Sequence, residues 1–236
     1  MIDKELLRSE AEKIGIVLND EALNRFDRYA EILVEWNEKM NLTAITEPKE
    51  IVIRHFIDSL TALNALEIPQ GASLIDVGTG AGFPALPLKI ARPDLKVTLL
   101  DSLNKRITFL NAAADAIGVQ VRAIHGRAEE SGRMPQLREK FDVATARAVA
   151  LLPVISEYCI PFVKVGGAFL AMKGPDRGEE IDSARKAVAT LGAKIESVTE
   201  TSLPDGSGRT LIVCRKTSPT PAAYPRHGSK ISKKSL

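Results

Sequence analysis

Apolar residues in the first part of the chain recur with the spacing of a helix. Between Glu21 and Lys39 they fall at three- and four-residue intervals, at Leu23, Phe26, Ala30, Leu33 and Trp36, which places them on one face of an amphipathic helix. That face needs a partner, and a second helical stretch, EIVIRHFIDSLTALNAL from residue 50 to residue 66, can cover it. Residues 1–70 are therefore predicted to form a helical unit, which the turn residues of IPQGAS close.

After residue 73 the pattern changes to short aliphatic runs that alternate with helical stretches. The runs are SLIDVG, KVTLLD, VQVRAIHG, FDVATARA, GAFLAMKG and TLIVCRK. Such alternation predicts an α/β fold over residues 71–216, with a mostly parallel sheet and helices on both faces. From 193 to 216 two strand-like runs flank LPDGSGR without a helix between them, which predicts a terminal antiparallel hairpin. Ligands of such sheets bind beyond the carboxyl ends of the strands, where the strand order reverses.

Composition is that of an ordinary soluble protein, but the charge is unevenly distributed. The chain has 236 residues, of which 44% are hydrophobic and 26% charged, and no apolar run is long enough to cross a membrane. The N-terminal segment lacks the pattern of a signal peptide, so we expect a cytoplasmic protein. Residues 1–70 carry 8 Lys and Arg against 14 Asp and Glu, whereas residues 215–236 carry six basic residues and no acidic one.

The basic C-terminal tail, residues 217–236, allows two interpretations. A block of one charge sign at a chain end is commonly a flexible, solvated segment. Alternatively, the Arg and Lys side chains of the tail neutralise the phosphates of a nucleic acid. Charge alone leaves both interpretations open.

A glycine-rich loop follows the first predicted strand in LIDVGTGAGFPALPL, residues 74–88. Asp76 precedes three closely spaced glycines, Gly78, Gly80 and Gly82, which could simply form a tight turn because glycine allows a close backbone approach. No Gly-Lys-Ser/Thr follows, and this excludes a P-loop. The dinucleotide pattern G-x-G-x-x-G fits poorly because Phe83 stands where its third glycine belongs.

Further candidate ligand-binding residues lie at the ends of the next predicted strands. Asp101 ends the second strand, where a carboxylate can accept hydrogen bonds from both ribose hydroxyls of an adenosine. Ala128 and Glu129 follow the third strand beside the expected adenine edge, and Arg147 follows the fourth. Taken singly, Glu129 could be a helix cap and Arg147 a surface charge. An acid before G-x-G-x-G and a second acid at the next strand end resemble the pattern of S-adenosylmethionine-dependent methyltransferases.

Several short strings extend this resemblance over nearly the whole chain. They are NLTAI, HFIDSL, DVGTGAGFPALPL, LLDSLNKRITFL, GRAEE, ARAVA, MKG and YPR. With them the sequence resembles the bacterial family of ribosomal RNA small subunit methyltransferase G, also called glucose-inhibited division protein B. Two features depart from the family pattern: Ala85 replaces a glycine of the GFPG string, and the tail lacks the usual proline near its end.

The resemblance implies a Rossmann-like class I methyltransferase fold, with a seven-stranded sheet behind an N-terminal helical unit. It also implies transfer of a methyl group from S-adenosyl-L-methionine to N7 of a guanine in the 530 loop of 16S rRNA, with S-adenosyl-L-homocysteine as product. The expected substrate is this rRNA or the small ribosomal subunit. The cofactor-binding residues expected from the loop, the strand ends and the resemblance are Asp76, Gly78, Gly80, Gly82, Phe83, Asp101, Ser102, Leu103, Ala128, Glu129 and Arg147.

Basic residues at strand ends and in the tail are the candidates for contact with RNA. Arg147 is expected beside the cofactor and the entering base. Phosphate contacts are expected from Lys173, Arg209, Arg226, Lys230, Lys233 and Lys234. His55 and Asp58 lie three apart on a predicted helix and are interpreted as holding the helical unit against the sheet, with direct RNA contact as the alternative.

Methyl transfer to guanine N7 requires few reactive groups from the protein. Guanine N7 carries a free lone pair and no proton, so no residue is expected to act as a general base, and catalysis is expected to come from alignment of the reactants. Cys159 and Cys214 lie in apolar surroundings and are expected to be buried free thiols. The three histidines form no cluster in the sequence, so no metal is expected. We also expect a monomer.

Three other functions stay open from the sequence. The first is a methyltransferase that acts on a small molecule or a protein, which would not need a basic arm. The second is an NAD-dependent oxidoreductase, which the glycine spacing disfavours. The third is a non-catalytic RNA-binding factor with a vestigial cofactor fold, since one fold hosts many functions.

Overall fold

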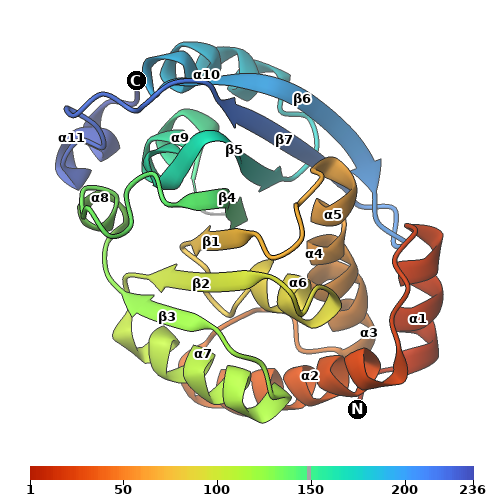
Figure 1. Ribbon diagram of the computed structural model, residues 1–236. Coiled ribbons are helices and arrows are strands. Elements are labelled where there is room, and N and C mark those ends of the chain that lie inside the picture. Colours follow the sequence, from red (N-terminus) through yellow and green to blue (C-terminus); the bar gives the residue numbers. More distant parts are fainter. Residues whose placement is uncertain (148–149) are drawn as a thin grey trace.

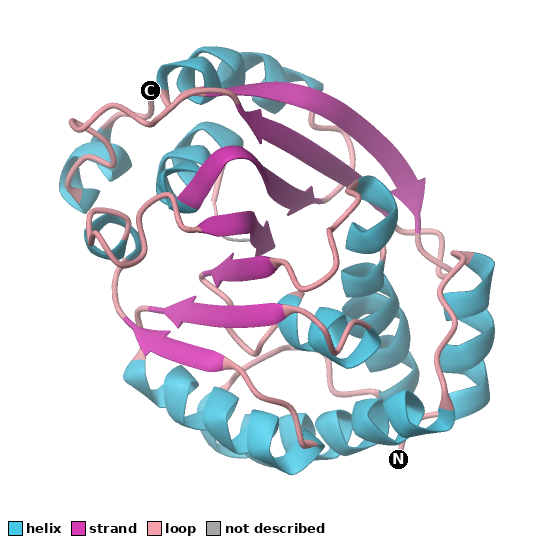
Figure 2. Cartoon of the chain, viewed as in Figure 1, coloured by secondary structure: helices cyan, strands magenta, loops and turns pink. Residues whose placement is uncertain are grey.

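The computed structural model describes residues 1–147 and 150–236. Within them a seven-stranded sheet is covered by helices on both faces (Figure 1, Figure 2). The strands, in chain order, are β1 (Ser73–Val77), β2 (Lys96–Asp101), β3 (Arg122–His125), β4 (Phe141–Arg147), β5 (Val163–Lys173), β6 (Ala193–Ser202) and β7 (Gly208–Lys216). The predicted α/β fold with a seven-stranded, mostly parallel sheet is confirmed.

The strand order determines where a ligand can bind. It is β3-β2-β1-β4-β5-β7-β6. The pairs among β1 to β5 are parallel, whereas β7 is antiparallel to both of its neighbours, β5 and β6. The predicted terminal hairpin is thus confirmed. The order reverses between β1 and β4, so the carboxyl ends of these two strands mark the expected ligand position.

The N-terminal helices cover one face of the sheet. They are α1 (Lys4–Lys13), α2 (Asp20–Met40) and a consecutive run of α3 (Pro48–Glu50), η1 (Ile51–Ile57), α4 (Asp58–Leu60) and α5 (Ala62–Ala65), in which η1 is π-helical. The amphipathic helix predicted for residues 21–39 corresponds to α2, which begins after Asn19, whose side chain accepts from the amide of Ala22. These helices share one hydrophobic core with α6 (Ala85–Ala91), α7 (Asn104–Ile117) and the sheet. A domain boundary at residue 70 stays a prediction.

The opposite face of the sheet carries a second core. There α9 (Leu152–Cys159), the short η2 (Ile160–Phe162) and α10 (Gly178–Thr190) pack against the sheet. Cys159 and Cys214 are buried as free thiols, as predicted. Within the two described ranges, no helix has both the length and the apolar character needed to cross a membrane.

The C-terminal tail is folded against the body of the protein. It ends in α11 (Gly228–Lys233), which lies beside α8 (Ala128–Ser131) and α9 (Figure 1). The guanidinium of Arg138 donates to the carbonyl oxygens of Thr220 (2.7 Å) and Tyr224 (2.8 Å), and Ile231 is fully buried. Of the two interpretations of this segment, the flexible one is therefore wrong for most of the tail. That interpretation was wrong because the charge of a chain end does not indicate whether its residues pack against distant parts of the chain.

Candidate functional site

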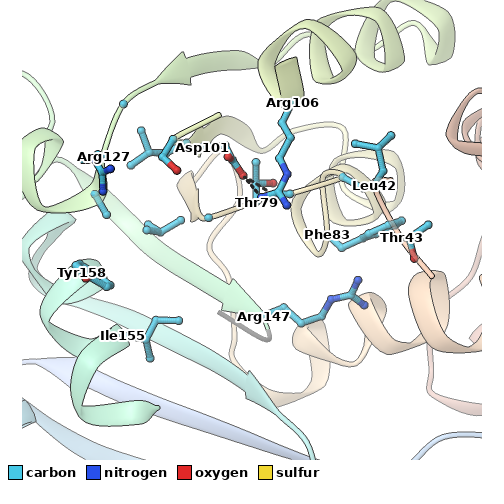
Figure 3. A pocket seen from close by; sticks show the side chains of 18 of the residues that line it. Leu42, Thr43, Thr79, Phe83, Asp101, Arg106, Arg127, Arg147, Ile155 and Tyr158 are labelled. Atoms are coloured by element: carbon cyan, nitrogen blue, oxygen red, sulfur yellow. Dashed lines mark hydrogen bonds and ion pairs between the residues drawn. The ribbon is translucent and has the colours of Figure 1, made fainter. Parts of the chain in front are cut away.

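A cavity of about 490 Å³ lies where the strand order reverses, beyond the carboxyl ends of β1 to β4. Its lining comes from three of those strand ends, from the loops after them and from the N-terminal helical region. Figure 3 shows Arg127, Ile155 and Tyr158 on one side of the cavity, and Thr43, Phe83 and Arg147 on the other. We call the first side, which includes Asp101, Ser102, Ala128 and Glu129, the cofactor end. The second side, with Leu42, Thr43, His55, Phe83 and Arg147, is called the acceptor end.

The glycine loop forms the wall between the two ends. Gly78 and Gly80 line the cavity with positive φ of 71° and 61°, a backbone conformation that glycine adopts without strain. Gly82 has a different role, because a Cβ there would lie 2.5 Å from Cδ1 of Leu86 and 2.8 Å from Oη of Tyr29. The loop thus needs glycine both for its shape and for the close packing of α6 beneath it.

Asp101 is held in place by backbone amides at the cofactor end. Its side chain is 2% exposed, Oδ1 accepts from the amide of Leu103 (2.9 Å) and Oδ2 accepts from the amide of Gly80 (3.0 Å). Arg106 also donates to Oδ2 at 3.2 Å. The carboxylate therefore faces the cavity where a ribose is expected, but one of its acceptor positions is taken by a side chain of the protein.

Asp76 lies beneath the glycine loop and is fully buried. Thr145 donates to its Oδ1 at 2.8 Å, and burial raises the pKa of Asp76 to about 7. Its Oδ2 and the hydroxyl of Thr79, which is on the cavity wall, have no hydrogen-bond partner in the described part of the chain. Unpartnered buried polar atoms at a cavity wall are suited to a polar ligand. The Thr79 hydroxyl on the wall and the carboxylate of Asp101 therefore fit a cofactor with polar groups, whereas Asp76 lies next to Thr79 but outside the lining of the cavity.

The acceptor end is built on a buried ion-pair network. Asp58 accepts from Arg147 at 2.9 Å and from Arg209 at 2.8 Å, and its side chain is only 5% exposed. Arg147 also lies over the ring of Phe83, with its Cζ 4.7 Å from the ring centroid. These contacts join the N-terminal helices to the ends of β4 and β7. They bear out the interpretation of Asp58 as a residue that holds the helical region against the sheet.

His55 fills the space between this network and the cavity. Its ring stacks on Phe83, with centroids 4.3 Å apart, and its Nδ1 lies 3.2 Å from Nη2 of Arg147. Burial and the charge of Arg147 lower the pKa of His55 to about 3, so its ring is neutral at pH 7. His55 therefore packs and positions its neighbours, and neither of its nitrogens is a free base.

The other expected cofactor residues separate into two groups. Ser102, Ala128 and Glu129 line the cavity, as do Phe83 and Arg147. Asp76, Leu103 and Gly82 do not reach its wall, although the amide of Leu103 donates to Asp101 and the amide of Gly82 donates to the carbonyl of Thr79, both of which line the cavity. The assignment of these residues to cofactor binding stays a prediction.

Three of the six residues expected to contact phosphates are engaged in ion pairs within the protein, as is Arg147, the residue expected beside the entering base. Lys173 pairs with Glu180 at 2.7 Å, Arg209 with Asp58, and Arg226 with the fully buried Glu157 at 2.6 Å. Lys230, Lys233 and Lys234 differ, since they are exposed on or next to α11 and have no ion-pair partner within the residues described. The last three are therefore the better placed for phosphate contact, and a role in RNA binding stays a prediction for all six.

The structure also adds cavity residues that the sequence reasoning did not single out. Thr43 and Arg106 line the cavity, and Tyr158 closes its cofactor end. Thr43 belongs to the NLTAI string, and Arg106 follows Asp101 by five residues in LLDSLNKR. Membership of these strings is the only feature of the sequence that points to Thr43 and Arg106. Their places in the cavity could not be predicted, because they depend on how the helices pack over the strand ends.

Comparison with known proteins places the chain among methyltransferases. A family model described as rRNA small subunit methyltransferase G matches residues 22–209. A protein of Clostridium perfringens (strain 13 / Type A) named ribosomal RNA small subunit methyltransferase G is 47% identical over 234 residues, which is 98% of each chain. A protein of the same name from Clostridium beijerinckii is 49% identical over 231 residues, 97% of each chain.

Solved structures agree on the fold. A methyltransferase from Pyrococcus furiosus matches with a TM-score of 0.56 and 17% identity, over 83% of this chain and 99% of that chain. Geranyl diphosphate methyltransferase in complex with SAM matches with a TM-score of 0.51 and 16% identity, over 68% of this chain and 84% of that chain. At such identities the likeness concerns the fold alone.

Proposed function

Because the chain belongs to the family of ribosomal RNA small subunit methyltransferase G, we propose that it transfers a methyl group from S-adenosyl-L-methionine to N7 of a guanine in the 530 loop of 16S rRNA. The observation that carries this proposal is the two-ended cavity at the carboxyl ends of β1 to β4. One end offers a buried carboxylate and the other an aromatic ring, an arginine and a hydroxyl. A cofactor and an acceptor base can thus meet at the glycine loop.

The cofactor end suits an adenosine. Asp101 accepts hydrogen bonds from the ribose hydroxyls, Ala128 and Glu129 border the adenine, and Thr79, supported by the buried Asp76, faces the amino-acid part. The sulfonium of the cofactor supplies the methyl group. Gly78 and Gly80 carry no side chain, so at these two positions only backbone stands between the methyl group and the acceptor end.

The acceptor end suits a nucleophile that needs no base. Among the described residues at this end, both ring nitrogens of His55 are in hydrogen bonds, with Thr43 and with Arg147, and Arg147 can only donate. Guanine N7 brings its own lone pair, so the protein has only to align it with the methyl group and the sulfur, a contribution of about 7 kcal/mol or more by proximity. Arg147 and Phe83 provide the rigid surface against which the base is aligned.

The decisive experiment is transfer of labelled methyl to small subunits that lack the modification. We expect incorporation at a single guanine, mapped by chain cleavage at 7-methylguanosine, and no incorporation into subunits that already carry it. Binding of S-adenosyl-L-methionine without labelling of RNA would move the acceptor to a small molecule or a protein. Absence of cofactor binding would favour a non-catalytic RNA-binding protein, and nicotinamide fluorescence on mixing would favour an oxidoreductase.

Phosphate contact by the tail has its own test. Replacing Lys230, Lys233 and Lys234 with Gln should reduce the slope of log affinity against log salt for rRNA. Each phosphate contact that is lost means that fewer counterions are released from the RNA on binding. Replacing Lys39, Lys186 and Lys194, which are likewise exposed and have no ion-pair partner in the described residues, provides a matched control of equal charge change. Point substitutions are preferable to a deletion because Arg226 and Ile231 anchor the tail. Equal slopes in the two triple variants would contradict the assignment.

A further inference from the structure

Thr43 presents a hydroxyl group at the acceptor end of the cavity (Figure 3). It lies in the loop between α2 and α3, just after Asn41, whose left-handed conformation (φ 48°) ends α2. The amide of Thr43 donates to Oδ1 of Asn37 at 2.8 Å, which fixes the backbone of the loop. The side chain is thus positioned by the C-terminal end of a long helix.

A chain of hydrogen bonds determines whether the Thr43 hydroxyl is free to donate or to accept. Arginine has no acceptor, so the contact of Arg147 Nη2 with His55 Nδ1 at 3.2 Å requires that Nδ1 accepts. The neutral ring then carries its proton on Nε2, and Nε2 donates to Oγ1 of Thr43 at 2.9 Å. Oγ1 accepts a second hydrogen bond from the amide of Ile45 at 3.0 Å.

Both lone pairs of the Thr43 oxygen are therefore occupied, and only its proton is left to interact. No acceptor for that proton lies within hydrogen-bond distance among residues 1–147 and 150–236. A half-buried hydroxyl locked as a donor at the wall of a binding cavity is suited to recognise an acceptor atom of a ligand.

We propose that the Thr43 hydroxyl donates a hydrogen bond to O6 of the target guanine and thereby selects guanine over adenine. This inference rests on the proposed function. N7 does not distinguish the two purines, since both present it as an acceptor on the same edge. The neighbouring group does: guanine has the acceptor O6, whereas adenine has an amino donor, which would face the Thr43 proton unfavourably.

The test combines two enzymes with two substrates. Small subunits are reconstituted with 16S rRNA carrying either guanine or 2-aminopurine at the mapped target position, and methyl transfer is measured for wild type and for Thr43→Val. 2-Aminopurine keeps N7 but lacks O6. We expect wild type to prefer guanine by about tenfold or more in kcat/KM, and Thr43→Val to show a smaller preference, because it loses the part that the hydrogen bond to O6 supplies. For guanine the loss should appear mainly in KM, because the hydrogen bond is present in both the ground state and the transition state.

Control variants separate recognition from folding. Thr43→Ser keeps the hydroxyl and should keep the preference for guanine over 2-aminopurine, whereas Thr46→Val changes an exposed threonine of the same loop and should leave both rates unchanged. If Thr43→Val lowers transfer to both substrates by the same factor, the residue only supports His55 and the inference is wrong. If wild type methylates no guanine at N7, the proposed function itself fails, and the two failures are distinguishable.

Discussion

The two ends of the cavity differ in how the chain assembles them. The cofactor end is lined by strand ends and the loops after them, so that Gly78, Asp101 and Glu129 arrive in chain order from β1, β2 and β3. The acceptor end collects Thr43 and His55 from the N-terminal helical region and Arg147 from β4, with Asp58 of α4 and Arg209 of β7 behind them. Local backbone geometry builds the first end, whereas long-range charge pairing builds the second. Substitutions should therefore affect the two ends in different ways.

The largest effect is expected at Asp58. Replacing Asp58 with Asn leaves Arg147 and Arg209, which are 14% and 19% exposed, without their common carboxylate. Breaking such a buried network should lower the free energy of unfolding by about 3 kcal/mol or more, as measured by urea denaturation. Asp20→Asn is the matched control, because Asp20 forms a single pair on the surface with Arg8 and its side chain is 87% exposed. Comparable losses in the two variants would contradict a structural role for the acceptor-end network.

Asp101→Ala should weaken cofactor binding at the cofactor end and leave substrate binding at the acceptor end unchanged. Loss of two charge-assisted hydrogen bonds to the ribose predicts about a hundredfold weaker binding of S-adenosyl-L-methionine, measured by calorimetry. Asp115→Ala, on the exposed side of α7, is the control and should bind normally. The KM for small subunits should stay unchanged in Asp101→Ala. A rise in that KM instead of the cofactor dissociation constant would reverse the assignment of the two ends.

Asp76 should make stability depend on pH. Its pKa is raised from 3.8 to about 7, so the folded protein holds this proton more tightly than the unfolded chain does. The free energy of unfolding should therefore fall as the pH rises from about 4 to about 7 and be independent of Asp76 above that range. Between pH 6 and pH 7 the difference between wild type and Asp76→Asn should change by about 1 kcal/mol. Parallel pH profiles for the two proteins would show that Asp76 is ionised throughout.

The smallest effect is expected at Arg106, which occupies an acceptor position of Asp101. Arg106→Gln removes a competitor for the ribose hydroxyls, and binding of S-adenosyl-L-methionine should become about threefold tighter, since this partly exposed pair contributes less than about 1 kcal/mol. Lys105→Gln removes the same charge from a neighbouring exposed residue and should have no effect. Weaker binding in Arg106→Gln would indicate that Arg106 contacts the cofactor directly.

The sequence by itself determined the α/β repeat, the antiparallel hairpin at its end and the cofactor end of the cavity. Strand periodicity, the glycine spacing and an acid at a strand end are local features, and parallel strands bring their carboxyl ends together in any such sheet. This is why Asp76, Gly78, Gly80, Asp101, Ala128 and Glu129 could be grouped from the sequence before their positions were known.

Only the tertiary structure decided the partners of the charged residues. Lys173, Arg209 and Arg226 look like free phosphate ligands in the sequence, yet each has an acidic partner, and for Arg209 and Arg226 that partner is far along the chain. The tail likewise packs beside the cofactor end, where a Cβ on Gly228 would lie 2.2 Å from Oε1 of Glu129. Ion pairs and close packing depend on distances between segments that are remote in sequence. No local pattern encodes those distances, and the fold must form before they are fixed.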